Sequence, residues 1–179
     1  MLTTKNSIFL VGLMAVGKST VGRHLAEELK LSFVDTDHEI EERAGVDIPW
    51  IFELEGEEGF RDREAQIVDE LTRRPGIVLA TGGGVVLREE NRRCLAARGS
   101  VIYLRSSIQH LLERTSRDKR RPLLQQPDVK EVLERLQEER GPLYREISDF
   151  QFDSGGGSPR ALARQIASAL RDEGTEYAR

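Results

Sequence analysis

The chain of 179 residues contains a single cysteine and no long apolar segment. Cys94 alone excludes an internal disulfide and a cysteine-based metal site, which suits a reducing cytoplasm, and we expect it to be a small buried residue. No apolar run approaches the roughly 18 residues that a membrane-spanning helix needs. The N-terminal apolar stretch lacks the basic flank and cleavage site of a signal peptide. We therefore expect a cytoplasmic protein with no membrane partner.

The chain also lacks an excess of positive charge. Its formal net charge is −4 and its isoelectric point is about 5.6. Binding to a nucleic-acid backbone relies on clustered Lys and Arg, so this balance argues against a nucleic-acid partner. The length fits one domain, with no internal repeat or low-complexity linker, so residues 1–179 are predicted to form a single unit. Because no further element is left over, we expect a monomer.

Short apolar runs alternate with charged, amphipathic stretches along the chain. Runs that are apolar on both faces and joined by helices predict a mostly parallel sheet covered on both sides, an α/β fold with ligands at the carboxyl ends of the strands. Three strand ends carry unusual residues and the other two look structural. A last helix is predicted over residues 159–170. The predicted strands are residues 8–11, 32–34, 77–80, 100–104 and 150–152.

The segment GLMAVGKS at positions 12–19 matches the phosphate-binding P-loop pattern G-x-x-x-x-G-K-[ST]. Its backbone N–H groups and the N-terminus of the following helix would hold phosphate oxygens. Lys18 would neutralise the β- and γ-phosphates, and the Ser19 hydroxyl would occupy one position on Mg²⁺. The alternative, a glycine-rich turn without a ligand, is disfavoured by the strand before it and the amphipathic helix after it. We expect nucleotide contacts from Ala15, Val16, Gly17, Lys18, Ser19 and Thr20.

An Asp-Thr-Asp sequence, Asp35 to Asp37, follows the second predicted strand. If the strand continues that far, alternation places both carboxylates on one side. Asp35 is then the candidate for Mg²⁺, bound through water, and Asp37 for orienting or deprotonating an acceptor hydroxyl. The competing interpretation is that Asp35 or Thr36 caps a helix that starts near His38.

Three consecutive glycines, Gly82, Gly83 and Gly84, follow Thr81 at the end of the third predicted strand. They cost more backbone entropy than a simple turn requires, and backbone without side chains suits the close approach of a ligand. Their N–H groups could hold a hydroxyl or carboxylate of a phosphate acceptor. The alternative is a mobile turn.

Arg61, Arg121 and Arg140 lie in marked local contexts. A guanidinium fork grips a carboxylate or phosphate through two parallel hydrogen bonds. The alternative for each is a solvated helix face with an ion-pair partner one turn away. Two segments could close over a ligand: the helical insertion between the second and third strands, with a joint at residues 56–60, and the charged stretch 116–122.

Taken together, six motifs resemble the shikimate kinase family in order and approximate spacing. They are the P-loop, Asp-x-Asp, Phe-Arg-x-x-Glu, Gly-Gly-Gly, Arg-Pro-Leu-Leu and Arg-x-Pro-Leu-Tyr, and they extend over residues 8–170. The resemblance implies a three-layer α/β/α fold like that of nucleoside monophosphate kinases, with a five-stranded parallel sheet in the order 2-3-1-4-5. It implies an acceptor-binding subdomain at about residues 37–64 and a lid at about 114–127. It also implies ATP-dependent phosphorylation of the shikimate 3-hydroxyl, in the pathway to chorismate and the aromatic amino acids.

The same resemblance implies roles for individual residues. Arg61 and Arg140 would clamp the shikimate carboxylate, and Glu64 would hold Arg61 in place. The remaining shikimate contacts would come from the hydroxyl-facing acid, the glycine segment and an apolar wall: Asp37, Gly82, Gly83, Gly84, Ile48, Phe52 and Phe60.

On the nucleotide side, the resemblance places Arg121 of the lid on the ATP phosphates and sandwiches adenine between Arg114 and Pro159. Two positions depart from the family pattern. Ala15 stands where glycine is common, and Gly157 stands where some members have an arginine that touches ATP, a contact that Arg160 could replace.

Two other functions remain open from the residues alone. One is another small-molecule P-loop kinase, similar to gluconate kinase, because two arginines facing a glycine segment predict only a hydroxy acid. The other is a nucleotide-binding switch or degenerate kinase that regulates a partner. Retention of Lys18, Ser19, Asp35 and Asp37 argues against degeneracy.

Overall fold

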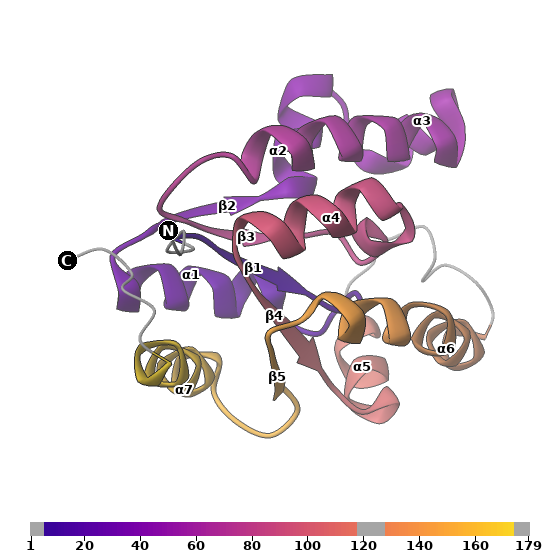
Figure 1. Ribbon diagram of the computed structural model, residues 1–179. Coiled ribbons are helices and arrows are strands. Elements are labelled where there is room, and N and C mark those ends of the chain that lie inside the picture. Colours follow the sequence, from indigo (N-terminus) through magenta and orange to yellow (C-terminus); the bar gives the residue numbers. More distant parts are fainter. Residues whose placement is uncertain (1–5, 118–127, 174–179) are drawn as a thin grey trace.

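A parallel β-sheet of five strands forms the centre of the molecule, in the order β2-β3-β1-β4-β5 (Figure 1). The computed structural model describes residues 6–117 and 128–173. The order is the predicted one. The strands are β1 (Ile8–Val11), β2 (Ser32–Asp35), β3 (Ile77–Ala80), β4 (Ser100–Arg105) and β5 (Phe150–Asp153).

Helices cover both faces of the sheet, which gives the predicted three layers. α1 and α7 pack against each other on one face, and α4 and α6 lie over the other (Figure 1). The helices are α1 (Lys18–Leu29), α2 (Thr36–Ala44), α3 (Ile48–Leu71), α4 (Glu89–Arg98), α5 (Ile108–Thr115), α6 (Val129–Ile147) and α7 (Pro159–Asp172), with a short 3₁₀ helix η1 (Val85–Leu87).

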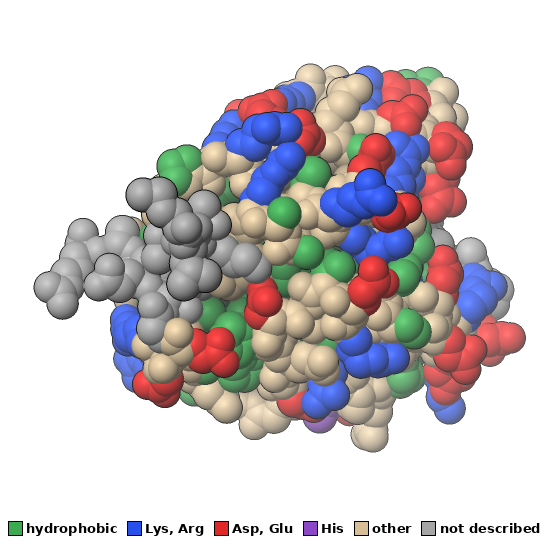
Figure 2. All heavy atoms as spheres, viewed as in Figure 1, with side chains coloured by type: hydrophobic (Ala, Val, Ile, Leu, Met, Phe, Trp, Pro, Cys, Tyr) green, Lys and Arg blue, Asp and Glu red, His purple; other side chains and the backbone are tan. Residues whose placement is uncertain are grey.

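The central strands explain why the core lies where it does. Every residue of β1 and β3 is buried, as expected for strands that have a helical layer on each side. The edge strand β5 instead alternates half-buried and exposed residues. Charged side chains of both signs are interspersed on the face seen in Figure 2.

Several predicted elements end too early. β2, β4 and β5 each extend one residue further than predicted, and α7 continues to Asp172. The assumption that the second strand could extend to Asp37 was wrong, because β2 ends at Asp35 and α2 begins at Thr36. Cys94 is half-buried rather than buried.

The predicted acceptor-binding segment, residues 37–64, is helical. It comprises α2 and the first part of α3, which bends at Gly56, where φ is 72°. This bend lies within the predicted joint, and a positive φ there favours glycine. Of the predicted lid, residues 118–127 lie outside the described residues. Among residues 6–117 and 128–173, no helix is both long and apolar enough to cross a membrane.

Candidate active site

The carboxyl ends of four strands meet around one cavity of about 740 Å³. Because β1 lies between β3 and β4, the P-loop sits beside the glycine segment that follows β3. The end of β5 also contributes, through Asp153 and Ser154, so the expectation that the last strand is purely structural was wrong. The lining comes from the P-loop and α1 (residues 15–21), Asp35, Asp37, Thr81, Gly82, Gly83, Arg114, residues 153–154 and 156–159, Ala161, Leu162 and Gln165.

The P-loop backbone depends on unusual conformations. Gly12 has φ 149°, and a Cβ there would lie 2.4 Å from the Leu104 carbonyl oxygen, so only glycine fits. Ala15 has φ 63°, in the left-handed region. That conformation costs an L-residue on the order of 1 kcal/mol. The alanine at this position therefore stores strain that a glycine would relieve.

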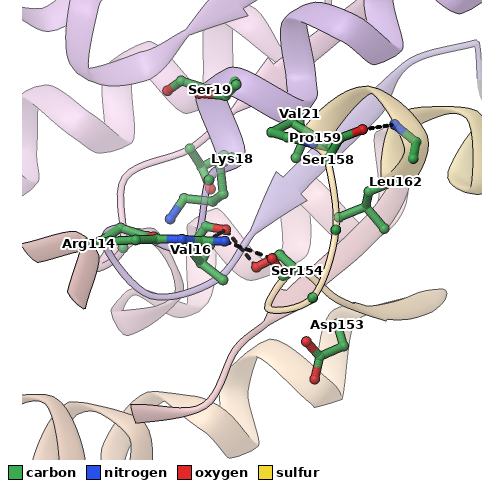
Figure 3. Close-up of a pocket in the computed structure, with 18 of the residues that line it drawn as sticks. Val16, Lys18, Ser19, Val21, Arg114, Asp153, Ser154, Ser158, Pro159 and Leu162 are labelled. Atoms are coloured by element: carbon green, nitrogen blue, oxygen red, sulfur yellow. Dashed lines mark hydrogen bonds between the residues drawn. The ribbon is translucent and has the colours of Figure 1, made fainter. Parts of the chain in front are cut away.

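Lys18, the first residue of α1, is buried at the base of the P-loop. Its ammonium group donates hydrogen bonds to the carbonyl oxygens of Gly12 (2.6 Å) and Leu13 (2.8 Å). The charge is thus held by the same loop whose amides would receive phosphates. Figure 3 shows the Lys18 side chain among the residues that line the cavity.

Ser19 and Asp35 contact each other in the lining of the cavity. The Ser19 hydroxyl donates to Asp35 Oδ2 at 2.5 Å. The other oxygen of Asp35 accepts from the backbone N–H groups of Asp37 and His38, so Asp35 is also the N-cap of α2. The capping interpretation is therefore confirmed for Oδ1 of Asp35, while Oδ2 lies beside Ser19 in the cavity lining.

Arg114 joins three parts of the cavity wall. Its guanidinium donates to the carbonyl oxygens of Ala15 (3.2 Å), Val16 (2.9 Å) and Ser154 (2.8 Å). The buried Ser154 hydroxyl donates to Val16 at 2.7 Å (Figure 3). Arg114 thus links α5, the P-loop and the segment after β5. The sequence contains no local signal for this arrangement, because the partners lie 98 and 138 positions from Val16.

Asp37 reaches the site from the first turn of α2, not from a strand. A Cβ placed on Gly82 would lie 2.8 Å from Asp37 Oδ1, so this carboxylate lies against the glycine segment. Thr36, fully buried beside it, accepts a hydrogen bond from the Gly82 N–H at 3.0 Å. The Gly82 N–H therefore has a partner within the protein, and its predicted contact with an acceptor stays a prediction.

The glycine segment leaves room for neighbouring side chains of the protein itself. None of the three glycines has a positive φ, so backbone conformation does not demand glycine there. A Cβ on Gly82 would also meet Glu64 Oε2 at 3.0 Å, and one on Gly84 would lie 2.3–2.5 Å from the Arg61 guanidinium. One on Gly83 would lie 3.3 Å from the Met14 amide nitrogen. The glycine segment is therefore next to the P-loop, as predicted.

A buried charge cluster surrounds this segment. Arg61 and Glu64, both on α3, form an ion pair at 2.8 Å, and neither is more than 8% exposed. Arg140, on α6, is 5% exposed, and its Nη1 would lie 3.6 Å from a Cβ on Gly83. The solvated-face interpretation is therefore wrong for Arg61 and Arg140. Arg121 lies outside the described residues.

Polar atoms in this cluster lack partners. Within residues 6–117 and 128–173, Arg61 Nε, Arg140 Nε and Glu64 Oε2 are buried without a hydrogen bond. Burial raises the pKa of Glu64, and the nearby Arg61 opposes that rise. Buried polar atoms are normally paired, so these three indicate a place for a polar ligand or water. Two arginines there favour an anion, most simply a carboxylate.

An apolar wall stands beside the cluster. The rings of Phe52 and Phe60 lie 4.8 Å apart, and the Arg61 guanidinium lies 5.1 Å from the centre of the Phe60 ring. Ile48, at the start of α3, is partly buried against the same core. A small carbocycle with a few polar groups would match this combination of apolar wall and convergent charges.

Most predicted residues converge on the cavity or the cluster beside it. Apart from Arg121, the cavity lining contains the nucleotide and metal candidates as well as Asp37, Gly82 and Gly83. The remaining acceptor candidates lie outside that lining, in or beside the charge cluster: Arg61, Glu64, Gly84, Arg140, Ile48, Phe52 and Phe60. Thr36, Ser154 and Tyr144, whose hydroxyl donates to the Gly83 carbonyl oxygen, were not predicted from the sequence.

The parallel sheet in this order, with a P-loop facing an arginine-lined acceptor cluster, defines a P-loop kinase of small molecules. A family model described as shikimate kinase matches residues 14–171. The chain belongs to the shikimate kinase family.

Individual relatives agree with this assignment. A shikimate kinase from Legionella pneumophila (strain Corby) is 56% identical over 167 residues, which are 93% of this chain and 95% of that protein. One from Vibrio parahaemolyticus is 53% identical over 171 residues, covering 96% and 99% of the two chains. A solved structure of shikimate kinase from Acinetobacter baumannii in complex with shikimate matches with a TM-score of 0.93, at 47% identity and 97% coverage of each chain.

Proposed function

We propose that this protein transfers the γ-phosphoryl group of ATP to the 3-hydroxyl of shikimate, giving shikimate 3-phosphate and ADP. The observation that carries the proposal is the buried pair Arg61 and Arg140, each with an unpartnered Nε, beside a glycine segment in contact with the P-loop. Membership of the shikimate kinase family then names the hydroxy acid that the geometry alone leaves open.

The nucleotide would lie along the P-loop, with its phosphates on the backbone amides and its base between Arg114 and Pro159. Both of those residues line the cavity. Lys18 already has its ammonium at the loop, and it would pair with the phosphates by exchanging carbonyl partners. Since Arg114 also holds the P-loop carbonyls, the base and phosphate positions depend on the same guanidinium.

Ser19 and Asp35 fit a magnesium ion. They offer a hydroxyl and a carboxylate oxygen that already meet at 2.5 Å on the cavity wall. In the described part of the chain, no group of three or more His, Cys, Asp or Glu side chains could hold a metal. That fits Mg²⁺, which takes few protein ligands and completes its shell with water and substrate phosphates. When bound there, Mg²⁺ would neutralise charge on the transferring phosphoryl group.

The acceptor would bind with its carboxylate between Arg61 and Arg140 and its ring against Phe52 and Phe60. This orientation would bring a hydroxyl toward Asp37, at the border between the acceptor cluster and the nucleotide cavity. Asp37 would orient that hydroxyl or take its proton as the oxygen attacks the γ-phosphorus. Phosphoryl transfer depends mainly on such positioning and on charge stabilisation.

The direct test is ADP release by the purified chain with ATP and Mg²⁺, using shikimate, quinate and gluconate as alternative acceptors. We expect turnover with shikimate and little with the other two. Preference for gluconate would favour the gluconate-kinase alternative. ATP consumption that no hydroxy acid stimulates would favour a nucleotide-binding switch.

A further inference from the structure

Tyr144, the last residue of the Arg-x-Pro-Leu-Tyr motif, contacts the backbone of the glycine segment. It lies on α6, is fully buried, and its hydroxyl donates a hydrogen bond to the Gly83 carbonyl oxygen. A buried tyrosine usually finds a partner for its hydroxyl, but here the partner belongs to the acceptor site.

The direction of that hydrogen bond fixes a peptide group. A trans peptide is planar, and its C=O and N–H point in opposite directions. Holding the Gly83 carbonyl toward α6 therefore directs the Gly84 N–H away from α6. Within residues 6–117 and 128–173, neither the Gly83 N–H nor the Gly84 N–H donates a hydrogen bond. These two donors lie beside the unpartnered atoms of the charge cluster.

Thr36 holds the other end of the same segment. It accepts from the Gly82 N–H, and the Val85 N–H donates to the Gly82 carbonyl at 3.1 Å, closing a turn over the glycines. The turn is thus attached to α2 by one buried hydroxyl and to α6 by another. Tyr144 is the attachment nearer to the two free donors.

Arg140 lies one helical turn earlier on the same helix, α6, and its Nη1 would lie 3.6 Å from a Cβ on Gly83. One helix therefore supplies both the carboxylate-binding guanidinium and the hydroxyl that orients the glycine backbone. Burial raises the pKa of Tyr144 above its ordinary value, so the hydroxyl keeps its proton and remains a donor at neutral pH.

We propose that Tyr144 is a positioning residue for the acceptor: by holding the Gly83 carbonyl, it directs the Gly84 N–H toward the bound hydroxy acid. This inference rests on the proposed function for the identity of the acceptor. A purely structural role would instead confine Tyr144 to packing of the core.

A neighbouring tyrosine provides a matched control. Tyr103, on β4, is 1% exposed, and its ring centre lies 5.1 Å from that of Tyr144. Its hydroxyl accepts from Gln137 Nε2 at 3.2 Å and contacts no glycine of the segment. Tyr103→Phe thus removes a buried hydroxyl from the same aromatic pair without touching the acceptor site.

The test compares Tyr144→Phe with Tyr103→Phe in steady-state kinetics, thermal unfolding and amide hydrogen exchange. We expect Tyr144→Phe to raise the KM for shikimate about tenfold, the effect of losing one hydrogen bond, while the KM for ATP stays within about twofold. Tyr103→Phe should leave both KM values unchanged even if it lowers the melting temperature equally. An unchanged KM for shikimate in Tyr144→Phe, or equal changes in the two variants, would overturn the proposal.

Hydrogen exchange separates this result from the proposed function. In the absence of substrates, Tyr144→Phe should speed exchange of the Gly82 and Val85 amides, whose hydrogen bonds hold the glycine turn, and Tyr103→Phe should not. If the wild-type chain failed to phosphorylate shikimate, the proposed function would fall, and this comparison would still decide whether Tyr144 holds the glycine backbone. Identical exchange in both variants and the wild type would refute that role.

Discussion

Removing Arg61 should lower both the stability of the protein and its affinity for the acceptor, and the two effects can be measured separately. Glu64 is fully buried, and its close ion-pair partner at 2.8 Å is Arg61. Deleting one member of a buried pair costs about 3–5 kcal/mol, because the other charge is left in a poorly solvated place. For a domain of this size, 1 kcal/mol corresponds to about 2–4 °C, so Arg61→Ala should lower the melting temperature by roughly 6–20 °C.

The loss of stability in Arg61→Ala should increase with pH. The pKa of Glu64 is already raised above 4.5 by burial, and removing Arg61 raises it further. A group with a higher pKa in the folded state binds its extra proton when folded, so it favours folding below the unfolded pKa and loses that effect as pH rises through the folded pKa. Arg61→Ala should therefore be least destabilised in mild acid and most destabilised above neutrality.

A double variant separates the two effects. Arg61→Ala combined with Glu64→Gln removes the stranded charge and should recover most of the lost stability at pH 8. Acceptor binding should not recover, because the carboxylate clamp is still missing. The KM for shikimate should rise by roughly 30- to 4,000-fold in both variants, corresponding to about 2–5 kcal/mol for a desolvated charge pair.

Urea denaturation at several pH values and coupled measurement of ADP release would provide both readouts. The KM for ATP serves as the internal control and should barely change. Equal unfolding free energies for the single and double variants at pH 8 would refute the claim that Glu64 depends on Arg61. A wild-type KM for shikimate in Arg61→Ala would remove Arg61 from the acceptor site.

Three further predictions concern other parts of the site. Gly84→Ala should displace the Arg61 guanidinium, which lies 2.3–2.5 Å from the added Cβ. It should raise the KM for shikimate at least tenfold and lower the melting temperature, because Arg61 pairs with the buried Glu64; an unchanged KM for shikimate would contradict this. Arg114→Ala removes three hydrogen bonds to carbonyls of the nucleotide cavity and should raise the KM for ATP about tenfold or more; calorimetry showing unchanged ATP affinity would contradict this. Asp37→Asn should lower kcat at least 100-fold with nucleotide binding kept, and near-normal turnover would refute the role of Asp37.

The fold could be predicted because its determinants are local. Each central strand is a short apolar run, and each functional loop directly follows a strand. The boundary at Asp35 could not be predicted in this way, because Asp35 both ends a strand and caps a helix. Alternation along a strand therefore gave the wrong reason for placing Asp37 in the site, although the residue does lie there.

The missed residues act through contacts that are distant in sequence. Thr36 and Gly82 are 46 positions apart, and Tyr144 and Gly83 are 61 positions apart. No periodicity or spacing links such pairs before the sheet brings them together. Tyr144 did carry a signal, since a tyrosine within a marked arginine motif is a residue whose hydroxyl needs a partner. Thr36 lies between Asp35 and Asp37, and only these two acids were predicted to be functional.

The border formed by Asp37, Gly82 and Gly83 belongs to the nucleotide cavity and also touches the acceptor cluster. The two proposed substrate positions therefore share this border. A bisubstrate inhibitor, with a carboxylate at one end and a polyphosphate at the other, would have to cross it, and a short, unbranched linker would suit the contact between Asp37 and the glycine segment.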